Sequence, residues 1–146
     1  MTEAQAGAQL ERILHAMREG RRMAGIAELV DARLLEAHAG RVRVEYAVKP
    51  EFMHPGQAVQ GGIVTVYADM AMALAAHTLC DEGEFLTTSQ LSISFLAPVT
   101  AGPVFAEGRV VKRGRSTFFM EASVLDPDGR HLARASSVGV SRKIKR

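Results

Sequence analysis

The sequence predicts an α+β fold in which an antiparallel sheet of about six strands wraps around one long central helix, with a further helix at the N-terminus. Three observations support this prediction. The run from Gly61 to Cys80 is apolar on almost every side, as in a helix that other elements enclose. The segments after it alternate apolar and polar residues, and their short connections favour antiparallel pairing. A length of 146 residues suits one domain.

The first segment of the chain has the pattern of an amphipathic helix. Its apolar residues recur at the spacing of one helical face, namely Leu10, Ile13, Leu14 and Met17. Gly20 stands where such a helix would end, and a short helical turn is expected around Ile26 to Val30. We therefore expect an N-terminal helical segment over residues 1–31, ahead of the main domain at 32–146.

Strands are expected on both sides of the central helix. Two precede it and meet at a turn over residues 38–40, and in the second of them Val42, Val44 and Tyr46 face one side. After the helix, Leu91, Ile93 and Phe95 alternate with polar residues. Three more strands follow, with turns at residues 113–114 and at the Asp-Pro-Asp-Gly sequence of residues 126–129.

Charge and composition exclude several classes of function. The net charge is only +2, with basic residues gathered at the 112–115 turn and in the tail SRKIKR, as solvated ends or as patches that attract phosphate groups. Neither aromatic interleaving nor zinc-ligand spacing accompanies them, so no nucleic-acid partner is expected. Asp69 inside the long apolar run argues against a membrane span. A lone cysteine, Cys80, and the absence of a secretion leader favour the cytoplasm.

Asp69 is the most informative single residue because it lies among alanines, methionines and valines. Burying an unpaired carboxylate is costly, so this side chain should either meet a partner or face a cavity. Two interpretations follow, and the residues alone leave both open. Asp69 is either a catalytic group or a hydrogen-bonded structural acid.

The start of the same helix is suited to binding a carbonyl oxygen or an anion. Its first N–H groups lack partners, and Gly61 and Gly62 expose them without side-chain shielding. Gln60 and His54 could each add a donor. Asp69 lies nine positions after Gln60, roughly half a revolution and about 13 Å along the axis. One site could use both features only if two copies of the helix pair antiparallel, which predicts a dimer with two equal sites.

The residues at these positions are similar to those of a known family. The chain resembles the hot-dog fold acyl-CoA thioesterases, specifically the phenylacetate-degradation type, from about Ala32 to Val140. That family has an Asn, six residues later a His followed by two Gly, and an Asp nine residues after the His. Gly61, Gly62 and Asp69 match this spacing. Gln60 stands at the His position, as in a branch that reads QGG, and His54 stands at the Asn position.

The resemblance implies a fold and a site. The long helix would be wrapped by the sheet, and two sheets would join edge to edge with active sites at the dimer interface. Asp69 would act as base or nucleophile, while the Gly61 or Gly62 amide binds the thioester oxygen. The family often places a Ser or Thr at the start of the strand after the helix to position water, and Thr88 occupies that place.

We therefore expect an acyl-CoA thioesterase that releases a free acid and coenzyme A. Coenzyme A is part of the substrate, and neither a cofactor nor a metal is expected. Arg113 and Arg115 are candidates to meet the CoA phosphates, and the assembly is expected to be a homodimer or homotetramer. Two rival functions remain open: an enoyl-thioester hydratase or dehydratase on the same fold, in which His54 pairs with an acid, and a non-catalytic acyl-CoA-binding module.

Overall fold

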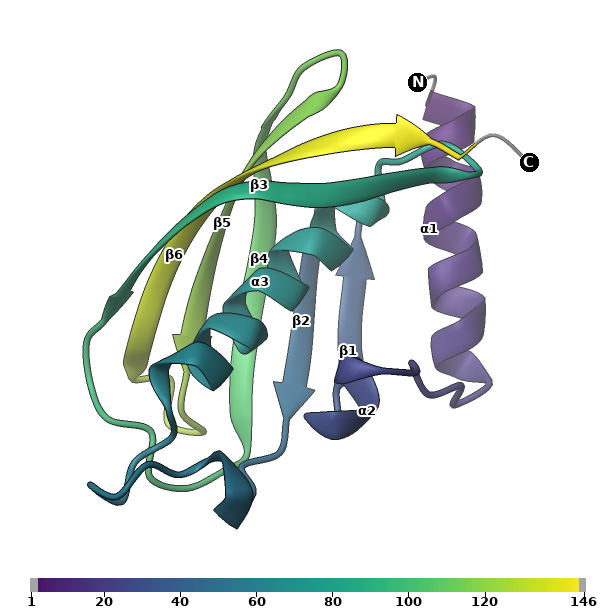
Figure 1. Cartoon of the computed structure of the whole chain (residues 1–146). Helices are drawn as coiled ribbons and strands as arrows, with labels where there is room; N and C mark the ends of the chain where they lie inside the picture. Colours follow the sequence, from purple (N-terminus) through teal and green to yellow (C-terminus); the bar gives the residue numbers. More distant parts are fainter. Residues whose placement is uncertain (1–2, 145–146) are drawn as a thin grey trace.

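The structure, a computed structural model that describes residues 3–144, consists of a six-stranded antiparallel sheet curled around one long helix (Figure 1). The strand order is β1-β2-β4-β5-β6-β3, so β1 and β3 form the two edges. The elements, in chain order, are α1 (Glu3–Arg18), α2 (Ile26–Leu29), β1 (Arg33–His38), β2 (Arg41–Tyr46), the 3-10 turn η1 (Pro50–Phe52), α3 (Gly61–His77), β3 (Glu84–Phe95), β4 (Val104–Arg113), β5 (Thr117–Leu125) and β6 (His131–Lys143). The predicted fold class is confirmed.

Helix α3 forms the centre of the core. Its sheet-facing residues are mostly small, and those that are buried are Val64, Tyr67, Ala68, Ala71, Met72, Ala75 and Ala76. The small side chains let the sheet come very close. A Cβ atom at Gly108 of β4 would lie only 2.3 Å from the Ala71 carbonyl oxygen, so only glycine fits where α3 crosses this strand.

The strand pattern expected from the sequence is also confirmed. In β2, Val42, Val44 and Tyr46 are buried against the core, and the intervening residues face outward. Strand β3 contains a register shift between Thr88 and Gln90 where it pairs with β6. Such a bulge redirects the side chains on one side of it, and it lies beside the middle of α3.

Helix α1 stands at the β1 edge of the sheet (Figure 1). Its predicted apolar face packs against the core through Leu10, Ile13, Leu14 and Met17. The helix ends at Arg18, and Gly20 has a φ of 65°. The last two residues of the basic tail, 145 and 146, lie outside the described residues. Among residues 3–144, no helix is long and apolar enough to cross a membrane.

Candidate active site

The segment before α3 is anchored on both sides. The N–H of Val59 donates to the Val99 carbonyl at 2.8 Å, and the N–H of Gln60 donates to the Phe52 carbonyl at 2.8 Å. The carbonyl of Gln60 accepts the N–H groups of Ile63 and Val64. These bonds fix where the first turn of α3 begins, so its free donors have a defined position and direction.

The first two amides of α3 remain available. Within residues 3–144, the N–H groups of Gly61 and Gly62 have no hydrogen-bond partner, and the exposed Gln60 side chain does not cap them. A Cβ atom at Gly62 would meet nothing within 4 Å. At Gly61 it would lie 3.1 Å from the ring of Phe95, so this ring covers one side of the helix start. Two aligned amide donors at the positive end of the helix suit a developing oxyanion.

Asp69 has one polar partner and one open oxygen. The hydroxyl of Thr88, on β3 at the bulge, donates to Asp69 Oδ1 at 2.8 Å. The side chain is half-buried. Within the described residues Oδ2 accepts no hydrogen bond and, unlike Asp81 Oδ1, is not sealed from solvent. The carboxylate is therefore oriented by a single bond while keeping an oxygen free to take a proton or attack a carbonyl.

Helix geometry refines the relation between the two features. Gly62 lies seven residues before Asp69, close to two full turns, so both occupy one face about 10 Å apart along the axis. From the sequence we expected the start of the helix to lie half a revolution around the axis from Asp69. That holds for Gln60 but is wrong for Gly62. The shared face also carries Val66 and Ala73, and none of its four residues is fully buried. The axial separation is too long for one carbonyl group to contact Gly62 and Asp69 of the same helix.

His54 lies in the turn ahead of α3 and has a defined tautomer. Its Nδ1 accepts the N–H of Gly56 at 2.9 Å, so a neutral ring carries its proton on Nε2. A Cβ atom at position 56 would lie 2.7 Å from the ring, which explains the glycine there. The half-buried His54 therefore offers one N–H donor, as an Asn would. Within residues 3–144 it makes no hydrogen bond to Asp69 or to the first turn of α3.

Tyr46 of β2 and Tyr67 of α3 support this region, and their hydrogen bonds were not predicted from the sequence. The Tyr46 hydroxyl donates to the Tyr67 carbonyl and the Tyr67 hydroxyl to the Ala47 carbonyl, each at 2.9 Å, with the rings stacked 4.7 Å apart. Burial raises the pKa of Tyr46, and the nearby negative charges of ionised Tyr67 and of Asp69 raise it further. Burial also raises the pKa of Tyr67 to about 12. Both stay protonated and fix the helix segment that carries Asp69. The sequence signal was limited to their apolar surroundings.

The two predicted phosphate-binding residues lie elsewhere: Arg113 is the last residue of β4, and Arg115 lies in the β4–β5 turn. Arg113 is largely buried: its guanidinium lies 3.6 Å from Glu84, donates to the Leu79 carbonyl and stacks 4.9 Å above the ring of Phe118. Arg115 is exposed. The bond to Leu79 places Arg113 just beyond the C-terminal end of α3, far from Gly61 of the same chain, and Arg115 follows it by two residues. No three potential metal ligands are grouped among the described residues.

Comparison with known proteins places these features in a family. The chain matches the model of the thioesterase superfamily over residues 56–133, a range that includes Gly61, Gly62, Asp69 and Thr88. A protein of Saccharolobus solfataricus, named as a candidate esterase, is 34% identical over 110 residues, which are 75% of this chain and 78% of that one.

Solved structures share the fold. A candidate thioesterase related to phenylacetic acid degradation, from Ralstonia eutropha JMP134, has a TM-score of 0.80 at 23% identity, covering 90% of this chain and 98% of its own. A thioesterase family protein from Silicibacter pomeroyi has a TM-score of 0.79 at 22% identity, with coverage of 90% and 98%. At these identities the likeness establishes the hot-dog architecture.

Proposed function

The chain belongs to the thioesterase superfamily and is a thioester hydrolase, and on this premise we propose that it hydrolyses acyl-CoA thioesters with Asp69 as the catalytic carboxylate. The observation that carries the proposal is the state of Asp69. It is held through one oxygen by Thr88, and its second oxygen is open on the exposed face of α3. A purely structural acid would be expected to have both oxygens satisfied.

The reaction can be written from these groups. The Gly61 and Gly62 amides donate to the thioester oxygen as negative charge develops there. Asp69 takes a proton from water, which attacks the carbonyl carbon, or attacks the carbon itself to form an anhydride that water then opens. In the first route the carbon–sulfur bond breaks after water has added, and the proton taken from water passes to the sulfur. In the second route the bond breaks as the anhydride forms and the thiolate leaves, and the proton released when water opens the anhydride balances the thiolate. One water is consumed, and one acid and one thiol are released.

The proposed site is shared between two chains. On one helix the amides and Asp69 lie about 10 Å apart on the same face, so an antiparallel second helix would bring each Asp69 to the other's Gly62. The unpaired edge of β3 supports this arrangement, because a second β3 could continue the sheet there. In such a homodimer, or a homotetramer built from it, two equal sites form. The exposed Arg115 is the better-placed candidate for the CoA phosphates, since Arg113 already has buried partners.

Neighbouring residues have supporting roles in this proposal. The Nε2–H of His54 and the amide of Gln60 are further donors to the thioester or to water, and neither is needed as an acid or base. The lone Cys80, which is buried and unpaired, is consistent with a protein that works in the reducing cytoplasm.

Substitution of Asp69 tests the proposal directly. We expect Asp69→Asn to fold normally and to lower kcat for thiol release by roughly 10²–10⁴-fold, the usual contribution of a positioned base. Asp128→Asn, in the exposed β5–β6 turn, is the matched control and should leave the rate unchanged. A panel of short, long and aromatic acyl-CoAs supplies the substrates, with free thiol as the readout.

Three outcomes would contradict the proposal in different ways. An Asp69→Asn variant with the wild-type rate would remove Asp69 from the chemistry. Hydration of crotonyl-CoA without release of thiol would replace hydrolysis with the hydratase reaction. A sedimentation measurement that finds only monomers in an active preparation would exclude the shared site.

A further inference from the structure

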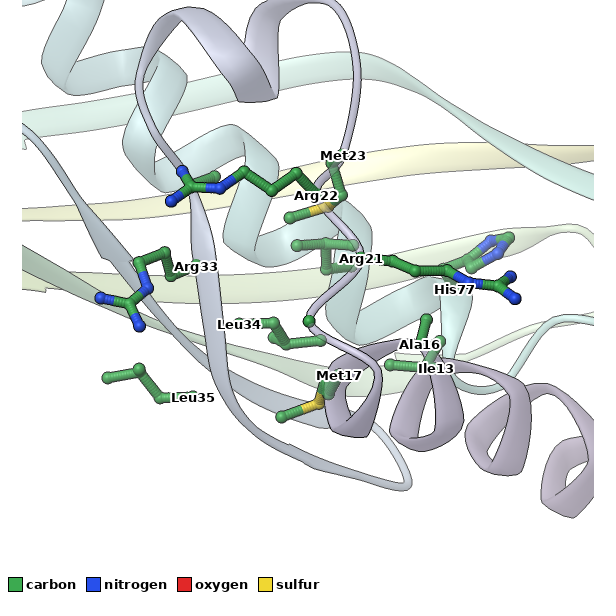
Figure 2. A pocket seen from close by; sticks show the side chains of 13 residues that line it. Ile13, Ala16, Met17, Arg21, Arg22, Met23, Arg33, Leu34, Leu35 and His77 are labelled. Carbon is green, nitrogen blue, oxygen red and sulfur yellow. The ribbon is translucent and has the colours of Figure 1, made fainter.

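A cavity of about 460 Å³ lies between α1, the segment after it, β1 and the C-terminal half of α3. Figure 2 shows Ile13, Ala16 and Met17 on the α1 side and Leu34 opposite them on β1. Further apolar side chains in the lining are Met23, Ala32, Leu35 and Leu74. The cavity opens to the surface, and its volume falls within the roughly 300–1,000 Å³ of small-molecule sites. The cavity therefore has the size and lining of a site for an apolar ligand.

One face of α3 connects this cavity to the proposed catalytic residue. Asp69, Ala73 and His77 follow one another at four-residue spacing, so they form a stripe along the helix. All three are half-buried, and His77 lines the cavity. Ala73, between the other two, has the smallest side chain of the three and leaves room beside the helix. An extended chain lying on this stripe would pass from the carboxylate into the cavity.

The charges at the cavity mouth indicate which part of a ligand enters. Three arginines line it, and each already has an acidic partner: Arg21 with Glu19 at 2.7 Å, Arg22 with Asp31, and Arg33 with Glu45 at 3.7 Å. At the α3 side, burial lowers the pKa of His77, with Glu84 opposing the shift, so this ring is neutral at pH 7. Paired arginines and a neutral imidazole suit an uncharged hydrocarbon end better than a free carboxylate.

We infer that this cavity receives the distal part of the acyl chain, so that α1 forms one wall of the acyl pocket and the enzyme prefers long apolar acyl groups. The inference rests on the proposed function. Asp69 and His77 are eight residues apart, or about 12 Å along α3. An extended chain advances roughly 1.2 Å per bond, as a polypeptide backbone does. Acyl chains of about ten carbons or more reach the cavity, and butyryl groups do not.

Filling the cavity from α1 tests the inference. In Ala16→Phe a ring occupies the space, and Phe is tolerated in a helix. We expect the ratio of kcat/KM for dodecanoyl-CoA to that for butyryl-CoA to fall at least tenfold, since each methylene kept out of the cavity costs roughly fourfold. Met23→Trp narrows the cavity from another wall and should act in the same direction. Ala39→Phe, at the exposed β1–β2 turn, is the control and should leave the ratio unchanged.

A binding measurement separates this inference from the proposed function. Calorimetric titration of Asp69→Asn protein with dodecanoyl-CoA, with and without Ala16→Phe, reports on the cavity even if no substrate is hydrolysed. Weaker binding in the double variant supports the inference. Equal binding, or an unchanged chain-length ratio in both Ala16→Phe and Met23→Trp, overturns it and leaves thioester hydrolysis standing. Absence of thiol release from every substrate would instead overturn the proposed function.

Discussion

The two ends of α3 differ in whether their backbone N–H and C=O groups have hydrogen-bond partners. At the C-terminal end, the Thr78 hydroxyl donates to the Ala75 carbonyl at 2.6 Å and accepts the Gly40 N–H at 2.7 Å. The guanidinium of Arg113 closes the next turn by donating to the Leu79 carbonyl. At the N-terminal end, no side chain caps the helix, and two amides have no partner within residues 3–144. The backbone groups at one end therefore have partners within the protein, and the amides at the other end are the donors that the proposed reaction uses.

This contrast separates residues that stabilise the fold from residues that serve the reaction. Changes at the C-terminal end should lower the free energy of unfolding and affect catalysis only through folding. Changes at the N-terminal end should reduce turnover with little effect on stability, because the free amides contribute nothing to the folded state beyond the helix itself. Each of the following variants tests one side of this division.

The buried ion pair at the C-terminal end should give the largest stability effect. Glu84 is 6% exposed and Arg113 19%, so Glu84→Gln removes a negative charge beside a poorly solvated guanidinium. Breaking a buried pair costs about 3–5 kcal/mol, and we expect urea denaturation to show a loss near the lower limit. Glu82→Gln, in the exposed pair with Arg12, should cost less than about 1 kcal/mol. Equal losses in the two variants would contradict the role assigned to burial.

The N-terminal amides are best tested by a pair of variants at Gly61. Both Gly61→Ala and Gly61→Pro add a Cβ atom against Phe95, but only proline removes the N–H. Proline suits the first helical position, and the ψ of 135° at Gln60 suits the residue before it. We expect kcat of the proline variant to be about 10²–10³-fold below that of the alanine variant, with similar melting temperatures. Equal kcat values in the two variants would show that the Gly61 N–H does not bind the oxyanion, which would leave Gly62 as the donor.

Thr78 should show a smaller, purely structural effect. Its hydroxyl is fully buried, and Thr78→Val would leave the buried Gly40 N–H without an acceptor. An orphaned buried donor costs about 1–3 kcal/mol, which chemical denaturation would detect. The exposed Thr100→Val variant is the matched control. A fall in kcat of folded Thr78→Val protein would break the proposed division between the two ends.

His77 should produce the smallest effect, a change in the pH dependence of stability. Burial lowers its pKa in the folded protein, so below the ordinary value of about 6.5 the unfolded chain binds a proton that the folded chain resists. Stability contributed by the neutral ring is therefore present above that pH and is lost as the pH falls through the folded-state pKa. Thermal unfolding of His77→Gln between pH 7.5 and 5 should be less pH-dependent than that of the wild type. Parallel curves would contradict this assignment.

The architecture was predictable because its signals are local. Alternation in β2 and β3, the Asp-Pro-Asp-Gly turn and the apolar run of α3 each depend on neighbouring residues only. The spacing of Gly61, Gly62 and Asp69 identified the candidate site in the same way. Thr88 was suggested by resemblance, and its hydrogen bond to Asp69 is visible only in three dimensions.

Features made by distant segments were not predictable. Arg113 appeared to belong to a solvated turn because its partner Glu84 is far away in the sequence and no periodic pattern links the two. Tyr67 of α3 is fully buried, and its hydroxyl donates to the Ala47 carbonyl, a contact that no local pattern indicates. The cavity beside α1 combines three separated parts of the chain, so its existence depends on how closely they pack.

The bulge in β3 makes the number of residues on each side of it important, because that number decides which side chains face α3. Leu86 and Thr88 turn toward α3 on one side of the bulge, and Leu91 and Ile93 do so on the other, although an odd number of positions separates the two pairs. Ser89 has no partner in the pairing of β3 with β6, so deleting it would remove the bulge and leave Thr88 and Leu91 on the same face in simple alternation. Deleting Thr87 instead would keep the bulge and turn Leu86 to the outer surface. Amino-acid replacements at many positions of β3 should be tolerated, and loss of Ser89 should keep the bond between Thr88 and Asp69, whereas loss of Thr87 should move Leu86 out of the core and lower stability.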